Sequence, residues 1–346
     1  MDWFTEDVLF EASNELAKRG YSFLLSLEGI LNPLGHGAFG YTYMAKDLHG
    51  HVFAVKIAKK PTKKHENSNR TFSPDHIDEI VFAQALRENP SDYIVKFYEE
   101  ILLDNFYILI MERVEGMSLE VLLSTRKLVD GHKLDRNEWR ILATCLIKAV
   151  CHLQAMGFVH RDIKPDNVMV VLNESGKIVG AKLIDFGLSR RACSEVPAAP
   201  ASATASTSTA FSQEKAYGTN SREDYSKSPA QKKVRLAEVM TSLVGTPVYS
   251  HPAVGKCSYR SECDTYSSGL VLYEAYIGKT VIPRIKRRFM AAKEKYWNYP
   301  VDKVLEGCDK DVSKVVMLLM SKENHPIEEA LEAINAFSCS YEQPKV

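Results

Sequence analysis

The chain has 346 residues, of which 45% are hydrophobic, 25% charged and 10% aromatic, a balance typical of a globular protein with more than one small core. Lysine plus arginine and aspartate plus glutamate both number 44, so no overall basic excess favours a nucleic-acid partner. Neither an apolar run of membrane-spanning length nor a secretory leader is expected, so we predict no membrane partner. The seven cysteines are scattered without zinc spacing, which predicts reduced thiols and an intracellular location, cytoplasmic or nuclear.

The first part of the chain predicts a small lobe that is mostly β-sheet. Residues 1–22 mix aromatic and charged side chains, which predicts a short amphipathic helix that either packs on its own lobe or docks a partner. Apolar stretches bounded by turn residues follow and predict strands over 51–58, 94–103 and 106–113. Residues 76–87 contain neither glycine nor proline and predict a helix.

The second part of the chain predicts a larger, helical lobe. Apolar residues recur at helical spacing from Trp139 to Leu153, which predicts a long buried helix that ends near Gly157. The sequence beyond residue 260 is also mostly helical in character. We therefore predict a small lobe over 23–112, a joint over 113–118, a large lobe over 119–337 and a tail over 338–346.

One segment departs from globular composition. Residues 193–212 are almost wholly alanine, serine, threonine and proline. Such a segment cannot bury enough apolar surface to offset the entropy of ordering it. We therefore predict a disordered insertion over about 190–240.

A glycine-rich segment precedes a lysine in an apolar strand. Gly35-His-Gly-Ala-Phe-Gly40 matches G-x-G-x-x-G, and a strand-like segment follows it where a dinucleotide-binding motif would open a helix. A glycine hairpin lets backbone amides approach phosphate oxygens, because no side chain intervenes. Lys56 comes next, in a strand where a lone lysine ordinarily extends its side chain to solvent.

Further motifs follow in an order that resembles a known family. They are His160-Arg-Asp-Ile-Lys-Pro-Asp-Asn167, Leu183-Ile-Asp-Phe-Gly187, Gly245-Thr-Pro-Val-Tyr249 and Asp264-Thr-Tyr-Ser-Ser-Gly269. With the glycine-rich segment and Lys56 before them, these motifs resemble those of the eukaryotic protein kinases. The resemblance runs from about Leu31 to Phe337 and implies an α+β, bilobal protein-kinase fold.

The resemblance implies roles in phosphoryl transfer, in which positioning and electrostatic stabilisation dominate. Lys56 would contact the α- and β-phosphates of ATP and would be held by Glu79. The neighbouring Asp78 is less suited to hold it, because it lies about 100° round the helix. Asp162 would act as the catalytic base, and Lys164 would stabilise the γ-phosphate.

Metal and nucleotide contacts are also implied by the resemblance. Asn167 and Asp185 would hold Mg²⁺, a hard ion that prefers oxygen ligands. The other residues that would contact ATP are Leu34, Gly35, Gly37, Ala38, Gly40, Thr42, Ala54, Met111, Glu112, Val114 and Met169. Thr42 is a departure, since the family usually has valine there, and it makes the roof over the adenine more polar.

Two features of the resemblance imply which amino acids accept the phosphate. Lys164, two residues after the catalytic aspartate, and Thr246 follow the serine/threonine-kinase pattern, so protein substrates with serine or threonine acceptors are expected. A pseudokinase or scaffold that binds nucleotide with little transfer is the alternative, and the complete catalytic set disfavours it. The Gly-Thr-Pro segment disfavours a kinase of small molecules.

The segment after residue 187 carries a predicted regulatory site and a departure from the family. In kinases the arginine at the position of Arg161 typically binds a phosphate on this segment. We therefore predict that an upstream kinase phosphorylates Ser242, three residues before Gly245, with Thr241 as the next candidate. The family's Ala-Pro-Glu is here His251-Pro-Ala253, and no arginine occurs after Arg288. Both partners of a buried ion pair are thus missing, which is less harmful than leaving one charge uncompensated.

Overall fold

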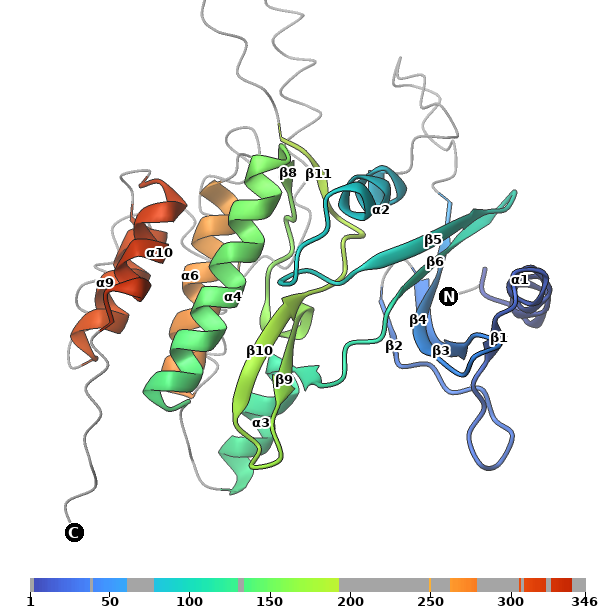
Figure 1. The fold of residues 1–346 in the computed structure, drawn as a ribbon, viewed down its shortest axis with the longest axis horizontal. Helices are drawn as coiled ribbons and strands as arrows, with labels where there is room; N and C mark the ends of the chain where they lie inside the picture. The colour runs from blue at the N-terminus through green and yellow to red at the C-terminus, as the bar shows by residue number, and fades with distance from the viewer. Residues whose placement is uncertain are drawn as a thin grey trace, which may run out of the picture.

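The computed structural model describes residues 3–37, 40–60, 78–129, 134–192, 249, 262–278, 305, 308–321 and 325–337. These residues form a small β-rich lobe and a larger helical lobe (Figure 1). This is the α+β, bilobal arrangement that the sequence predicts.

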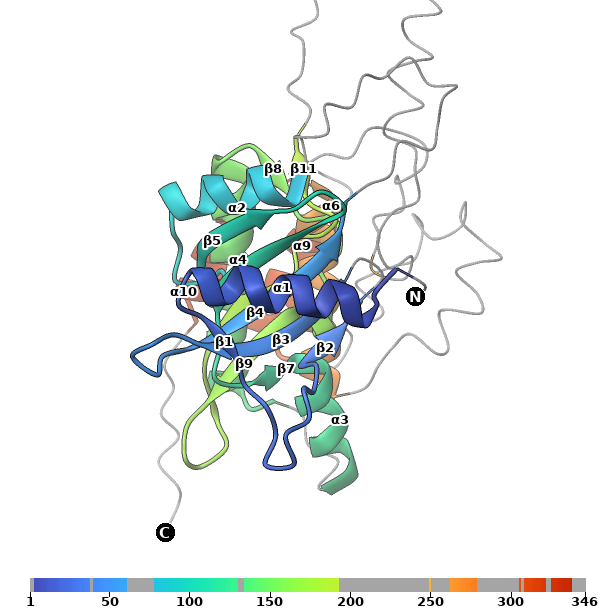
Figure 2. The same ribbon diagram turned by 90° about the vertical axis from the view of Figure 1, so that its right-hand side faces the viewer.

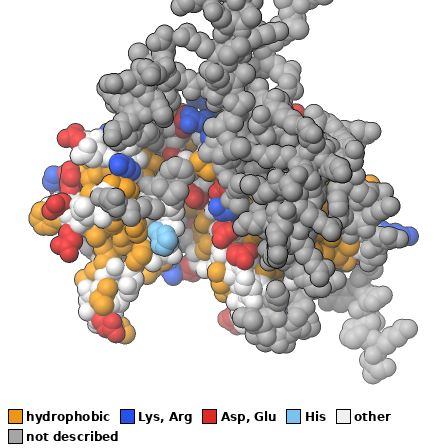
Figure 3. Space-filling model, turned by 180° about the vertical axis from the view of Figure 1, so that it is seen from behind, with side chains coloured by type: hydrophobic (Ala, Val, Ile, Leu, Met, Phe, Trp, Pro, Cys, Tyr) orange, Lys and Arg blue, Asp and Glu red, His pale blue; other side chains and the backbone are white. Residues whose placement is uncertain are grey.

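A six-stranded antiparallel sheet forms the small lobe, in the order β1-β3-β4-β6-β5, with β2 paired to β3. Its strands are β1 (Ser22–Phe23), β2 (Gly35–His36), β3 (Gly40–Lys46), β4 (Val52–Lys59), β5 (Phe97–Leu102) and β6 (Phe106–Glu112). Two helices accompany them, α1 (Glu6–Lys18) and α2 (Asp78–Glu88). Where described residues are visible on the face opposite to that of Figure 1, acidic, basic and apolar side chains are interspersed (Figure 3).

Helix α1 packs on its own lobe, where Figure 2 shows it lying across the sheet. Its buried residues Ala12 and Leu16 share an apolar core with Ile108 and Ile110 of β6. The ring of Phe4, just before the helix, stacks on Tyr41 and Tyr43 of β3 with centroids 4.2 and 6.1 Å apart. Of the two alternatives for this segment, the structure therefore shows packing within the chain.

One strand boundary is wrong in the sequence prediction. The strand expected from residue 94 begins at Phe97 instead. Ile94 forms an isolated parallel bridge with Leu183, and the Val95 amide donates to the Leu183 carbonyl at 3.1 Å. The backbone of these two residues is thus paired with the other lobe, so it is not available to the small-lobe sheet.

The large lobe is built around helix α4 (Arg136–Ala155). Asp135 and Glu138 form a capping box at its start, and its buried face carries the predicted apolar residues, among them Trp139 and Leu153. The helix ends before Gly157, whose φ of 72° suits glycine. Helices α6 (Glu262–Ile277), α9 (Lys310–Met320) and α10 (Ile327–Asn335) lie on one side of α4, and β10 lies on the other (Figure 1).

Short strands, a 3-10 turn and helix α3 complete the large lobe, and the motifs of residues 160–167 and 183–187 lie among them. They are β7 (Met117–Ser118), α3 (Leu119–Val129), β8 (Phe158–Val159), the 3-10 turn η1 (Pro165–Asn167), β9 (Val168–Leu172), β10 (Ile178–Leu183) and β11 (Arg190–Arg191). Strand β9 pairs with β10 and β7, and β11 pairs with β8. None of the helices in the described segments combines the length and apolarity needed to cross a membrane. The four described cysteines are free thiols.

Candidate active site between the two lobes

Lys56 and two carboxylates meet where the small lobe faces the large lobe. Lys56 lies in the middle of β4, and its side chain is only 10% exposed. Its Nζ donates hydrogen bonds to Glu79 Oε1 at 2.7 Å and to Asp185 Oδ1 at 2.8 Å. Helix α2 supplies Glu79, and the segment after β10 supplies Asp185. Three predicted site residues from distant parts of the chain are therefore in direct contact.

The charges of this cluster shift two of its pKa values. Burial acts to lower the pKa of Lys56, but the carboxylates of Glu79 and Asp185 outweigh burial and raise it above its ordinary value. Burial acts to raise the pKa of Asp185, but the charge and hydrogen bond of the Lys56 ammonium lower it to about 2. At neutral pH, Lys56 is therefore a cation and Asp185 an anion.

The two acidic residues at the start of α2 have different partners. Glu79 is buried and contacts Lys56, whereas the partly exposed Asp78 pairs with Arg190 of β11. Consecutive residues on a helix point in directions that differ by about 100°, so one of them faces Lys56 and the other does not. The structure brings together the pair that the sequence favours.

Tyr107 belongs to the same cluster, although the sequence analysis did not single it out. Its hydroxyl donates to Glu79 Oε2 at 2.6 Å, and the residue is 4% exposed. Burial, followed by the negative charge of Glu79, raises the pKa of Tyr107 well above its ordinary value. A polar tyrosine among the aliphatic residues of β6 was the signal available in the sequence.

Asp162, Lys164 and Asn167 form a second cluster in the loop that joins β8 to β9. Lys164 Nζ donates to Asp162 Oδ2 at 2.7 Å. Asn167 Nδ2 donates to the Asp162 carbonyl at 2.8 Å and to Asp162 Oδ2 at 3.1 Å. Because the side-chain amide nitrogen of Asn167 is directed at Asp162, the Oδ1 atom of Asn167 points away from Asp162.

Unusual backbone conformations mark this region. Among the described non-glycine residues, Arg161 and Asp185 have positive φ, at 70° and 61°. Such conformations cost energy and persist where the surroundings fix them, often at functional sites. At Arg161, Asp264 of α6 supplies that support, because its carboxylate accepts the His160 amide at 2.6 Å and the Arg161 amide at 2.9 Å. Burial raises the pKa of Asp264 despite these donors.

Aromatic contacts connect helix α2 to the loop after β8. The Phe186 ring stacks on Phe82 of α2, with centroids 4.3 Å apart, and meets the His160 ring edge-on at 4.8 Å. His160 Nδ1 accepts from the Asp162 amide at 3.2 Å, and Nε2 lies 3.1 Å from the Ile184 carbonyl. This arrangement requires the imidazole proton to be on Nε2, which fixes the orientation of the ring.

The predicted nucleotide contacts of the small lobe lie beside Lys56 in the sheet. The antiparallel registers place Gly35 opposite Thr42, Thr42 opposite Lys56 and Ala54 opposite Met111. Thr42 and Ala54 are therefore neighbours of Lys56 on adjoining positions of the sheet.

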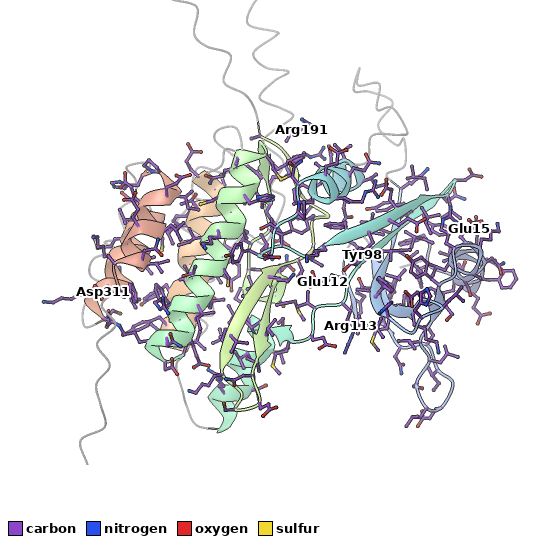
Figure 4. All side chains as sticks on the ribbon, in the orientation of Figure 1. Glu15, Tyr98, Glu112, Arg113, Arg191 and Asp311 are labelled. Atoms are coloured by element: carbon purple, nitrogen blue, oxygen red, sulfur yellow. The ribbon has the colours of Figure 1, made fainter. Side chains whose placement is uncertain are left out.

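The remaining nucleotide contacts lie at the edges of the two lobes. Leu34 is 51% exposed, and its amide donates to the Thr42 carbonyl at 2.7 Å. Glu112 ends β6 where the chain passes to the large lobe (Figure 4), and its carboxylate pairs with Lys182 of β10 at 2.8 Å. Val114 follows on this connection, and the half-buried Met169 lies on β9. The Gly37 amide closes the glycine-rich turn by donating to the Gly40 carbonyl at 2.9 Å.

Some predictions lie outside the described residues. They concern Ala38, Thr241, Ser242, the segments 245–248 and 251–253, and residues 193–240 of the predicted insertion.

The oxygen atoms available near the two clusters fit a hard divalent cation. Asn167 Oδ1 and the Asp185 carboxylate are both oxygen donors, and the Asp185 side chain is 43% exposed. The negative charge of Asp185 at neutral pH suits this role.

Comparison with known proteins agrees with the geometry. A bilobal α+β fold with a lysine–glutamate pair in one lobe and an Asp-Lys-Asn loop in the other defines the protein kinase class of architecture. Residues 29–215, more than half of the chain, match the family model described as protein kinase domain. The chain therefore belongs to the protein kinase family.

Its curated relatives have names of the serine/threonine type. The probable serine/threonine-protein kinase zyg-1 of Caenorhabditis elegans is 26% identical over 260 residues, which cover 75% of this chain and 28% of that protein. The serine/threonine-protein kinase ppk35 of Schizosaccharomyces pombe is 27% identical over 258 residues, which cover 72% of this chain and 37% of that protein. The probable serine/threonine-protein kinase pkgA of Dictyostelium discoideum is 28% identical over 185 residues, which cover 53% of this chain and 12% of that protein. The chain thus spans little more than a third of these relatives at most.

Proposed function

We propose that the protein is an ATP- and Mg²⁺-dependent protein kinase that transfers the γ-phosphate of ATP to serine and threonine hydroxyls of protein substrates. The observation that carries this proposal is the double contact of Lys56 with Glu79 at 2.7 Å and with Asp185 at 2.8 Å. An ammonium held between two carboxylates from different lobes is suited to orient phosphates next to a metal site.

In the proposed mechanism, the chain's own residues orient the reactants. Lys56 binds the α- and β-phosphates, and Asn167 Oδ1 and Asp185 hold Mg²⁺. When bound, Mg²⁺ neutralises charge on the phosphates. Asp162 accepts the hydrogen bond of the substrate hydroxyl and takes its proton as that oxygen bonds to the γ-phosphorus. Lys164 stabilises the charge on the transferring phosphoryl group, and the bond from the γ-phosphorus to the bridging oxygen of ADP breaks.

The adenine is proposed to lie between the small-lobe sheet and β9. Leu34, Thr42 and Ala54 would contact one face of the base, and Met169 the other. Glu112 and Val114 would offer backbone hydrogen bonds beside Met111. Support comes from the register, which places Ala54 opposite Met111.

Regulation by phosphorylation of Ser242 or Thr241 is part of the proposal. Arg161 would receive the phosphate, since a guanidinium binds phosphate oxygens in a bidentate manner. Support comes from its Nε, which donates to the Leu188 carbonyl at 2.6 Å, so the guanidinium lies beside the residue that follows the 183–187 motif. Full activity of protein that mass spectrometry shows to lack phosphate at both positions would contradict this part.

The proposal is tested with Asp162→Asn, which keeps the shape of the side chain but removes its basicity. Phosphate transfer from labelled ATP to a generic protein substrate should fall at least about 100-fold, within the range of general-base contributions. Asp166→Asn is the matched control, because this carboxylate lies in the same loop but is exposed. Its activity should stay within about twofold of wild type.

The alternatives give different results in the same assay. A pseudokinase would bind Mg²⁺-ATP but show no transfer in either the wild type or the control variant. A kinase of small molecules would show Asp162-dependent turnover of ATP with no labelled protein. Transfer that persists in Asp162→Asn would refute the proposed mechanism.

A further inference from the structure

The carboxylate of Glu79 is held from two sides. Its Oε1 accepts from Lys56 Nζ at 2.7 Å, and its Oε2 accepts from the Tyr107 hydroxyl at 2.6 Å. The Glu79 side chain is 3% exposed, so water does not replace a missing partner readily. Each oxygen of this buried carboxylate therefore depends on one protein donor from the sheet.

The strand register explains why Tyr107 reaches this position. Tyr107 lies opposite Ala58, and Lys56 lies opposite Leu109, on the neighbouring antiparallel strands β6 and β4. Tyr107 and Lys56 are thus diagonal neighbours on one face of the sheet, a spacing that long side chains bridge. Ile108, the next residue along β6, faces the opposite core, under α1. The face that carries Lys56 therefore also carries Tyr107.

A phenol is chemically suited to this position. Lys56 already pairs with Glu79 Oε1, and a second cation at Oε2 would compete with Lys56 for the same carboxylate. A neutral hydroxyl satisfies the second oxygen and leaves the Lys56–Glu79 pair intact. The raised pKa of Tyr107 keeps its hydroxyl protonated, and hence a donor, throughout the neutral range.

We propose that Tyr107 is a positioning residue, which holds helix α2 in the orientation where Glu79 engages Lys56. This inference rests on the proposed kinase activity, since its consequence is a change in how Lys56 meets the phosphates of ATP. Without the hydroxyl, one oxygen of Glu79 is buried with no donor, and rotation of α2 away from the sheet relieves that cost.

The test uses Tyr107→Phe in the full chain, which removes one oxygen and keeps the buried ring. We expect kcat/KM for ATP to fall about tenfold, which corresponds to about 1.4 kcal/mol. KM for the protein substrate should not change, because Tyr107 belongs to β6 of the small lobe, whereas Asp162, which is proposed to meet the substrate hydroxyl, belongs to the large lobe. Tyr43→Phe is the matched control, since Tyr43 is equally buried at 4% but belongs to the core under α1. It should leave both constants within about twofold of wild type.

A double-mutant cycle separates positioning from a general structural role. In a Glu79→Ala background the tyrosine has no carboxylate to hold, so adding Tyr107→Phe should cause no further loss in kcat/KM. Losses that multiply in the double variant, or a Tyr107→Phe enzyme with the constants of Tyr43→Phe, would overturn the inference. Absence of transfer by the wild type would refute the proposed function instead. In that case Mg²⁺-ATP binding measured by calorimetry supplies the readout, with the same tenfold weakening expected for Tyr107→Phe.

Discussion

Glu138 offers the most direct test of what holds the large lobe together. Its side chain is 2% exposed and accepts two hydrogen bonds from Arg126, at 3.0 and 2.7 Å. It also accepts from the amide of Ile178 at 3.0 Å and from the amide of Asp135 at 3.2 Å. One carboxylate therefore joins the end of α3, the start of α4 and the β9–β10 hairpin.

The variant Glu138→Gln removes the charge and keeps the shape. Loss of one partner from a buried ion pair costs about 3–5 kcal/mol, because the other charge is left uncompensated. Arg126 is 17% exposed and also donates to the Gly176 carbonyl at 2.7 Å, so we expect the lower end, about 3 kcal/mol. At about 2–4 °C per kcal/mol for a lobe of this size, Tm should fall by about 6–12 °C.

The pH dependence of this loss has a defined sign. Burial acts to raise the pKa of Glu138, but the Arg126 hydrogen bonds and the two backbone amides outweigh it and lower the pKa below 4.5. A lowered pKa stabilises the fold above pH 4.5, and this contribution is lost as pH falls through the folded-state pKa. Glutamine does not titrate, so the difference in Tm between the wild type and Glu138→Gln should be at its largest at pH 7. It should become smaller as the pH falls below 4.5.

The assay is differential scanning calorimetry of both proteins from pH 7 down to pH 3.5. Glu15→Gln is the control, because Glu15 pairs at the surface with Lys18 and Arg19, whose side chains are 67% and 34% exposed. Pairs of this kind along a helix contribute about 0.3–0.5 kcal/mol each, so the control should lose at most about 4 °C. A loss for Glu138→Gln no larger than that of the control, or a difference independent of pH, would refute the reasoning.

Two further variants test packing. A Cβ added at Gly40 would lie 2.1 Å from the Ile57 carbonyl oxygen, so Gly40→Ala must separate β3 from β4. We expect the free energy of unfolding, measured in urea, to fall by about 2 kcal/mol. In the control Gly35→Ala, the added Cβ meets nothing within 4 Å, so this variant should unfold as wild type does. Phe337 stacks on the fully buried Trp139, with ring centroids 5.7 Å apart. Phe337→Ala should therefore lower the free energy of unfolding by about 3 kcal/mol in the same measurement. A decrease of less than about 1 kcal/mol would contradict this packing.

Local patterns in the sequence predicted most of the fold, because periodicity reports directly on which face of an element is buried. The apolar spacing from Trp139 to Leu153 matches the buried face of α4, and the predicted strand over 51–58 corresponds to β4 at Val52–Lys59. The strand start at residue 94 was predicted wrongly, since Ile94 pairs with Leu183 across the lobes. Composition does not reveal a pairing between residues so far apart in the chain.

The candidate site was predictable where a motif names the residue and unpredictable where support comes from elsewhere in space. The place of Glu79 in the helix that the family resemblance implies favoured it as the partner of Lys56, and Asp78 was less suited because it lies about 100° round that helix. Tyr107 and Asp264 were not given a role, because each acts on a residue far away in the sequence. Asp264, for instance, accepts the Arg161 amide across 103 positions.

The described C-terminal helices are attached to helix α4 through one arginine. Arg136 at the start of α4 pairs with both Asp309 and Asp311 at the start of α9, and its guanidinium lies 4.9 Å from the centre of the Phe337 ring. Asp309 also caps α9 through its own side chain, so the arginine binds a carboxylate already fixed at a helix N-terminus. These contacts join α9 and the residue that follows α10 to the start of α4. One arginine therefore anchors the described C-terminal helices to α4, through two carboxylates and one aromatic ring.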